Sequence, residues 1–188
     1  MKPKLLFISS RPLYPITGGD QIRTVQQLEL LKEKFDIDVL YMTDTKDEYT
    51  LKKTVDFVSE VYCFRISRLR HWLQTLKSIY NGLPLQVSYY LNSNVVKTIR
   101  RISVKYDVIF CNNIRTAEYA RNFQGKKILD FVDAISMNYE KAMHQTSGIK
   151  KLIYAIDYRR CKRYERECLT RFDGCAVISE VDKQYILS

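Results

Sequence analysis

The chain has 188 residues, of which 46% are hydrophobic and 28% are charged, a composition typical of a globular domain rather than of a fibrous or disordered chain. Its formal net charge is +10, and no apolar run approaches the roughly 20 residues that a transmembrane helix needs. It has only two histidines, and none of its five cysteines forms a Cys-x-x-Cys motif. We therefore expect no metal, no cofactor and no disulfide framework.

Apolar and amphipathic segments alternate along the whole chain. Short apolar runs predict strands at residues 4–9, 36–42, 61–64, 107–111, 128–131 and 174–179. Residues spaced three and four apart predict helices at 20–34, about 49–57, 67–80, 91–104, 134–144, about 149–171 and from about 180 onward. Apolar strands that alternate with helices indicate a mostly parallel sheet covered on both faces. The predicted fold is therefore α/β, doubly wound and Rossmann-like.

The loop between the first strand and the first helix contains Gly18 and Gly19, two of only six glycines. In a doubly wound sheet this loop lies at the ligand-binding crevice, where exposed glycine amides can approach an anion. Arg23, one turn into the helix, could reach a phosphate, and Asp20 is expected to cap the helix. A plain turn and an exposed helical arginine are the alternatives. Neither a G-x-G-x-x-G motif nor a P-loop motif occurs.

Polar residues also follow the predicted fourth strand. Asn112, Asn113 and Arg115 lie on the crevice side of the sheet and suit hydrogen bonds to sugar hydroxyls. Asparagine is also common in ordinary loops.

Two predicted helices combine apolar and basic residues. One side of helix 67–80 carries Leu69, Trp72, Leu73, Leu76 and Ile79 next to three basic residues. This side either packs on the sheet or lies on an anionic membrane. In helix 149–171 we expect the basic residues to point outward. Five residues at near-helical spacing should face inward: Ile153, Ile156, Cys161, Tyr164 and Cys168.

Four segments together resemble group 1 glycosyltransferases, the large retaining family with the GT-B fold. The first is "FISSRPLYPITGGDQIRTVQQLELLKEKFDIDVLYMT", with its Pro-containing loop that ends in Gly-Gly. The others are "NGLPLQVSYY", "ILDFVDAISMNYEK" and "YERECLTRFDGCAVISEVDKQYI". They occur in the family's order and spacing and cover nearly the whole chain.

The resemblance implies that residues 1–188 form the N-terminal, acceptor-side domain of such an enzyme. The C-terminal domain, which binds most of the nucleotide-sugar donor, would be absent from this chain. The expected reaction transfers a sugar from a nucleotide-sugar donor to a glycan or lipid-linked acceptor in polysaccharide biosynthesis, with retention and only with both domains present. Gly18 and Gly19 match the family's glycine loop near the donor diphosphate or the acceptor.

The resemblance also places Asp133 near the reacting centre, where many relatives have His or Asp. Its carboxylate could accept a proton from the acceptor hydroxyl, orient that hydroxyl, or simply cap the helix that follows.

Two other functions fit parts of the sequence. The chain could be a non-catalytic doubly wound module that regulates or binds a nucleotide, or the charge of +10 could serve nucleic-acid binding. No nucleic-acid recognition motif occurs, and we expect no nucleic-acid partner. Without a signal peptide the expected location is the cytoplasm, with peripheral contact at the inner face of the membrane as an open alternative.

Overall fold

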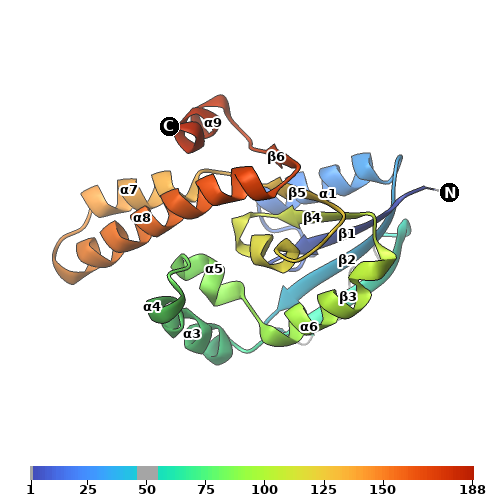
Figure 1. Ribbon diagram of the computed structural model, residues 1–188, viewed down its shortest axis with the longest axis horizontal. Coiled ribbons are helices and arrows are strands. Elements are labelled where there is room, and N and C mark those ends of the chain that lie inside the picture. Colours follow the sequence, from blue (N-terminus) through green and yellow to red (C-terminus); the bar gives the residue numbers. More distant parts are fainter. Residues whose placement is uncertain (1, 46–54) are drawn as a thin grey trace.

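A central parallel β-sheet organises the chain (Figure 1). The computed structural model describes residues 2–45 and 55–188. Within them the sheet has six strands in the order β3-β2-β1-β4-β5-β6, all parallel. The predicted doubly wound, Rossmann-like α/β fold is confirmed.

All the predicted strands are present, with small changes at their ends. β3 begins at Val58 rather than at residue 61, and β6 ends at Ala176 because Ile178 donates its amide to the Val132 carbonyl in the loop after β5. The strands are β1 (Lys4–Ser9), β2 (Asp36–Thr43), β3 (Val58–Arg65), β4 (Val108–Asn112), β5 (Lys126–Asp130) and β6 (Gly174–Ala176).

The helices follow the predicted pattern, except that one predicted helix is divided and one short helix is added. The helix predicted at 67–80 is split into α3 and α4, and Gly82 ends α4 in a left-handed conformation at φ 67°. The segment before residue 91 forms a further short helix, α5. The helices are α1 (Gly19–Leu31), α3 (Arg68–Leu76), α4 (Ser78–Asn81), α5 (Leu85–Tyr90), α6 (Ser93–Ile102), α7 (Ile135–His144), α8 (Gly148–Arg171) and α9 (Glu180–Leu187), with 3₁₀ segments η1 (Ser103–Lys105) and η2 (Ile114–Ala120). The helix predicted at 49–57 lies largely outside the described residues.

The strands bury both of their faces, as a parallel sheet requires. In β1, Leu5 and Phe7 pack into the cluster on the α1 side, and Leu6 and Ile8 pack into the larger cluster with α5, α6 and η2. Helix α1 joins its cluster through the buried Leu28 and the partly buried Leu31.

The start of α1 differs from the prediction. Gly18 is the N-cap residue and no side chain caps the helix, so the prediction that Asp20 is the cap is wrong. Asp20 lies within the first turn, where a carboxylate is favoured by the helix dipole, and pairs with Arg11. Thr24 faces inward, since it lies one turn before Leu28 on the same side of the helix, whereas Ile22 is about half exposed.

Only half of α8 packs in the predicted register. Cys161, Tyr164 and Cys168 are buried as expected, but Ile153 and Ile156 are about half exposed. The N-terminal half of α8 extends away from the sheet with α7 beside it (Figure 1). The side of this half of α8 that faces away from α7 is therefore not covered by the sheet, and Ile153 and Ile156 stay half exposed.

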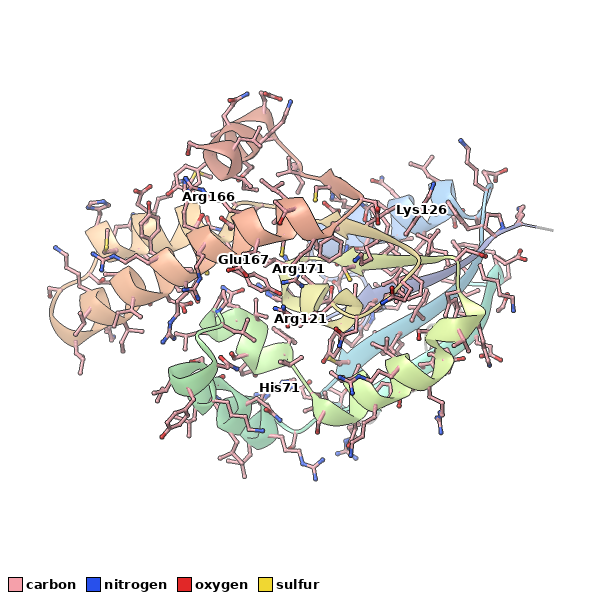
Figure 2. The ribbon with its side chains drawn as sticks, in the orientation of Figure 1. His71, Arg121, Lys126, Arg166, Glu167 and Arg171 are labelled. Carbon is pink, nitrogen blue, oxygen red and sulfur yellow. The ribbon has the colours of Figure 1, made fainter. Side chains whose placement is uncertain are left out.

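A fully buried carboxylate joins α8 to α7. Glu165 accepts hydrogen bonds from the amide of Ser136, at 2.9 Å, and from its hydroxyl. Burial raises the pKa of Glu165, and the two bonds from Ser136 oppose this rise without cancelling it. Arg171 and Arg121, labelled in Figure 2, both bind Glu118 of η2. Arg171 thereby fastens η2 to the C-terminal end of α8, whereas Arg121 directly follows η2 itself.

We expect Glu165→Gln to change how stability depends on pH. The pKa of the Glu165 carboxyl is higher in the folded protein than the ordinary value of 4.5 that applies to the unfolded chain. As the pH rises above 4.5, the unfolded chain gives up this proton first, so the free energy of unfolding falls. In urea unfolding, the free energy of unfolding of the wild type should therefore fall relative to that of Glu165→Gln as the pH rises above about 4.5. Glu167→Gln, on the exposed side of α8, is the control. If the difference in free energy of unfolding between the wild type and Glu165→Gln does not vary with pH, the pKa of Glu165 is not raised.

Candidate functional site

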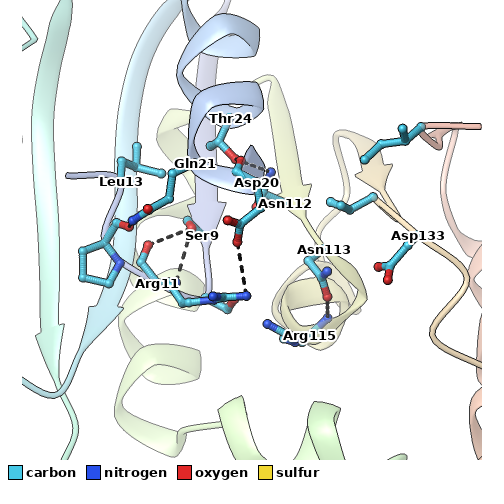
Figure 3. Close-up of a pocket in the computed structure, with 14 residues that line it drawn as sticks. Ser9, Arg11, Leu13, Asp20, Gln21, Thr24, Asn112, Asn113, Arg115 and Asp133 are labelled. Carbon is cyan, nitrogen blue, oxygen red and sulfur yellow. Dashed lines mark hydrogen bonds and ion pairs between the residues drawn. The ribbon is translucent and has the colours of Figure 1, made fainter. Parts of the chain in front are cut away.

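A polar crevice of about 430 Å³ opens at the carboxyl ends of β1 and β4 (Figure 3). The strand order reverses between these two strands, which is the place where open α/β sheets bind their ligands. Loops after β1, β4 and β5 form its walls, together with the first turns of α1. Its lining residues are Ser9, Ser10, Arg11, Pro12, Leu13, Asp20, Gln21, Thr24, Asn112, Asn113, Arg115, Val132, Asp133 and Ile178.

The loop after β1 brings a guanidinium to the crevice. The Ser9 hydroxyl donates to the carbonyl of Arg11 at 2.8 Å and accepts from its amide at 3.3 Å, which folds the loop tightly. Arg11 then pairs with Asp20 across the crevice mouth at 3.2 Å (Figure 3). Both side chains are about half exposed, so this pair contributes little stability and a ligand can replace it.

The residues after β4 serve partly the fold and partly the crevice. Asn112 donates to the Thr24 hydroxyl at 3.1 Å, which ties β4 to α1. Asn113 has a left-handed backbone, with φ at 71°, and its side chain accepts from the Arg115 amide. The two asparagines are thus held in place by their own structural hydrogen bonds at the crevice wall.

Arg115 is the most enclosed cation of the crevice. Its Nε donates to Gln86 at 2.8 Å, and its guanidinium lies 5.4 Å from the centre of the Tyr90 ring. Burial lowers the pKa of Arg115, and the nearby charge of Arg11 lowers it further. Arginine nevertheless stays protonated in proteins. Two cations that face one cavity favour an anionic group between them.

Asp133 lies on the wall formed by the loop after β5. Its carboxylate accepts from the Asn138 side chain at 2.6 Å and caps no helix, because the N-cap of α7 is Ala134 and the amide of Ala134 is bound by Asp182. The helix-cap interpretation of Asp133 is therefore wrong. The side chain of Asp133 lines the same crevice as Arg11 and Arg115.

The two glycines lie at the edge of this site. Gly18 has an extended backbone, with φ at −156°, and Gly19 is the first residue of α1. Neither is among the residues that line the crevice, and neither has a positive φ. A Cβ built on Gly19 would have no atom within 4 Å, so no close approach of the chain requires glycine at that position.

Arg23 has a protein partner. Its guanidinium binds Asp130, whose side chain is fully buried at the end of β5, with N–O distances of 2.9 to 3.2 Å. Gln27 donates to the same carboxylate at 2.6 Å. The structure thus places Arg23 in an internal ion pair between α1 and β5 rather than at the crevice.

The same buried carboxylate shapes the turn that carries Asp133. Asp130 accepts from the Val132 amide at 3.1 Å, and Val132 has a φ of 68°, a conformation that β-branched residues rarely adopt. The Val132 carbonyl in turn accepts from Ile178 at 3.0 Å. These bonds hold Val132 in this conformation and fix where Asp133 leaves the sheet.

Several residues that line the crevice were not predicted from the sequence. Ser9 ends the strand predicted at residues 4–9, and Ser10 and Arg11 directly follow it, so their position at a strand end indicates the crevice as it does for Asn112. Gln21 and Thr24 follow no strand, and no motif in the sequence indicates them.

An apolar groove of about 330 Å³ lies beside the crevice. It is lined by Trp72, Thr75, Leu85, Gln86, Tyr89, Tyr90, Arg115 and Tyr139. Arg115 borders both spaces, so a long ligand could extend from the polar crevice into the aromatic groove.

Comparisons with known proteins assign no family to this chain. No description of a known protein family matches the sequence. No curated protein is significantly similar to it either. In residues 2–45 and 55–188, no cluster of His, Cys, Asp or Glu side chains is arranged to hold a metal ion.

We expect Arg23→Met to destabilise the protein by about 3 kcal/mol, because it leaves a fully buried carboxylate with only neutral donors. Urea unfolding measures the change. Asp130→Asn added to Arg23→Met should restore part of the loss, because it removes the unpaired buried charge. Gln27 and Val132 donate to different carboxylate oxygens, so the single amide oxygen of Asn can keep only one of these two bonds and the rescue stays incomplete. An effect of Arg23→Met below roughly 0.5 kcal/mol would show that the pair is not a structural link.

We expect Gly19→Ala to stabilise the protein by about 0.5 kcal/mol, because alanine fits the open space at a helical position and restricts the unfolded chain. Gly125→Ala is the matched control: its Cβ would lie 2.6 Å from the Asp107 carbonyl oxygen and from the Phe123 ring, so it should destabilise. Thermal unfolding distinguishes the two. A destabilising Gly19→Ala would show that the loop needs glycine for its conformation.

Proposed function

We propose that this chain is the acceptor-binding half of a glycosyltransferase. The enzyme would move a sugar from a nucleotide-sugar donor to a glycan or lipid-linked acceptor, with retention at the anomeric carbon. The observation that carries the proposal is the crevice at the β1/β4 switch point, where Asp133 faces two arginines across a polar cavity. The resemblance of four segments to group 1 glycosyltransferases supports it.

Asp133 has the chemistry to handle an acceptor hydroxyl. Asn138 occupies one oxygen of its carboxylate, and no described residue donates a hydrogen bond to the other. In the proposal that second oxygen accepts a hydrogen bond from the acceptor hydroxyl and orients it toward the donor sugar. A retaining front-face reaction needs no strong protein base, so orientation is sufficient.

The two arginines suit a negatively charged group on the acceptor or the donor. Arg115 is preorganised by Gln86 and Tyr90, whereas Arg11 must leave Asp20 to bind a ligand. Guanidinium groups bind phosphate and carboxylate through paired hydrogen bonds. In the proposal Arg115 provides the fixed contact and Arg11 closes over the bound group.

The proposal assigns this chain only one wall of the active site. The donor nucleotide would be held mainly by a second Rossmann-like domain that residues 1–188 do not contain. Transfer requires donor and acceptor to be held together in near-attack geometry. We therefore infer that the 188-residue chain alone binds nucleotide sugars weakly and transfers no sugar.

The test compares the 188-residue chain with a longer protein that includes the second domain. Calorimetry with nucleotide sugars should detect binding only in the longer protein. In a transfer assay, Asp133→Asn in that protein should lower kcat/KM roughly 100-fold. Glu180→Gln, an exposed carboxyl on α9, is the control and should leave activity unchanged.

Three results would contradict the proposal. Tight nucleotide-sugar binding or turnover by the 188-residue chain alone would favour a self-contained nucleotide-binding module. Full activity of Asp133→Asn would remove the assigned role of that carboxylate. Failure of the longer protein to transfer any sugar would leave the crevice as a non-catalytic binding site.

A further inference from the structure

Helix α3 and the short helix α4 point their apolar side to solvent. The apolar residues recur at the three- and four-residue steps of one helix face, the pattern that normally packs inward. Here each of these residues is between 54% and 92% exposed; they are Leu69, Trp72, Leu73, Leu76, Ile79 and Tyr80. The described chain therefore leaves a continuous apolar helix face uncovered.

Polar and aromatic residues attach α3 to the fold instead. His71, labelled in Figure 2, is buried, and its Nδ1 hydrogen-bonds the carbonyl of Tyr89 at 2.7 Å. The imidazole also stacks on the Tyr89 ring with centroids 4.4 Å apart. Ser78 is buried on the same side. Because these residues anchor the helix, the fold does not need the apolar face for its own packing.

The charged side chains of α3 and of the residue that links it to α4 are all basic. The sequence contains no Asp or Glu between Glu60 and Asp107. Arg68 pairs with Asp44 at 2.6 Å, while Arg70 and Lys77 are exposed and have no ion pair with any described residue. The apolar face is thus bordered by cations.

The N-terminal half of α8 repeats this combination. Its exposed apolar residues alternate with the exposed Lys150 and Lys151, and they are Ile149, Leu152, Ile153 and Ile156. The middle of α8 contacts the segment that follows α4, where Asp157 accepts from the Leu85 amide at 2.9 Å. Helices α3 and α4 and the N-terminal half of α8 lie toward the same end of the molecule (Figure 1). We call the two sets together the α3–α8 surface.

We propose that the α3–α8 surface docks on an anionic phospholipid bilayer. Exposed apolar side chains and a tryptophan enter the interface between headgroups and acyl chains, and lysine and arginine pair with anionic headgroups. No helix in residues 2–45 and 55–188 is long and apolar enough to cross a membrane, so the contact is peripheral.

A bilayer fits this surface better than a second copy of the chain. A two-fold contact places the same patch on both partners, so Arg70, Lys77, Lys150 and Lys151 would face like charges. An anionic bilayer meets the apolar and the cationic residues at the same time. The proposal does not depend on the sugar-transfer reaction and can fail or hold separately from it.

Trp72 reports the contact directly, because it is the only tryptophan of the chain and is 64% exposed. The test mixes the 188-residue chain with vesicles of equal parts phosphatidylcholine and phosphatidylglycerol. We expect the protein to sediment with the vesicles and the Trp72 emission to shift to the blue. Binding should weaken at about 1 M salt, where charges are screened beyond ~3 Å.

Two variants locate the surface. Leu73→Gln/Leu76→Gln removes exposed apolar area without touching the core, so it should weaken vesicle binding roughly tenfold and leave thermal stability unchanged. Arg70→Glu/Lys77→Glu should weaken it by a similar factor. The matched control is Leu30→Gln, which removes a 75% exposed leucine from α1 on another side of the molecule and should change nothing.

Several outcomes would overturn the proposal. They are a protein that does not sediment with these vesicles at low salt, equal binding to vesicles of phosphatidylcholine alone, and equal losses from the control and the surface variants. A Trp72 blue shift that depends on protein concentration without lipid would assign the surface to a second copy instead.

Discussion

The buried ion pair between Asp130 and Arg23 connects the parts of the molecule that form the crevice. Asp130 ends β5 and Arg23 lies on α1, so the pair spans the sheet from one side of the switch point to the other. A carboxylate without solvent must be fully satisfied by donors. Arg23, Gln27 and the Val132 amide supply them, and the last of these bonds sets the turn from which Asp133 enters the crevice.

The crevice therefore combines rigid and replaceable parts. Asn112, Asn113 and Arg115 are oriented by hydrogen bonds that belong to the fold. The contacts between Arg11 and Asp20 and between Asp133 and Asn138 lie at the surface, where hydrogen bonds and ion pairs exchange readily with water or a ligand. Such a division suits a site whose ligand arrives from an open side, because the walls stay in place while the groups at the mouth rearrange.

The same hydrophobic periodicity led to two different outcomes. In the C-terminal half of α8 the apolar spacing correctly identified the buried residues Cys161, Tyr164 and Cys168. In α3 and at the start of α8 the same spacing marks residues that are exposed. Periodicity shows that a helix has an apolar side, but which side faces the core depends on the neighbouring elements. For α3 that neighbour is α5, which presents Tyr89 and favours the polar side that carries His71.

The sequence by itself determined the α/β class, the parallel sheet and the positions of nearly all strands, because apolar runs and turn residues are local signals. It also placed Asn112, Asn113 and Arg115 at one edge of the sheet, since residues that follow parallel strands meet there. Only the tertiary structure decided that Arg23 belongs to Asp130, that Asp20 does not cap α1 and that the apolar side of α3 faces outward. These outcomes depend on partners distant in the chain, and no local pattern records which distant residue will be near enough to pair.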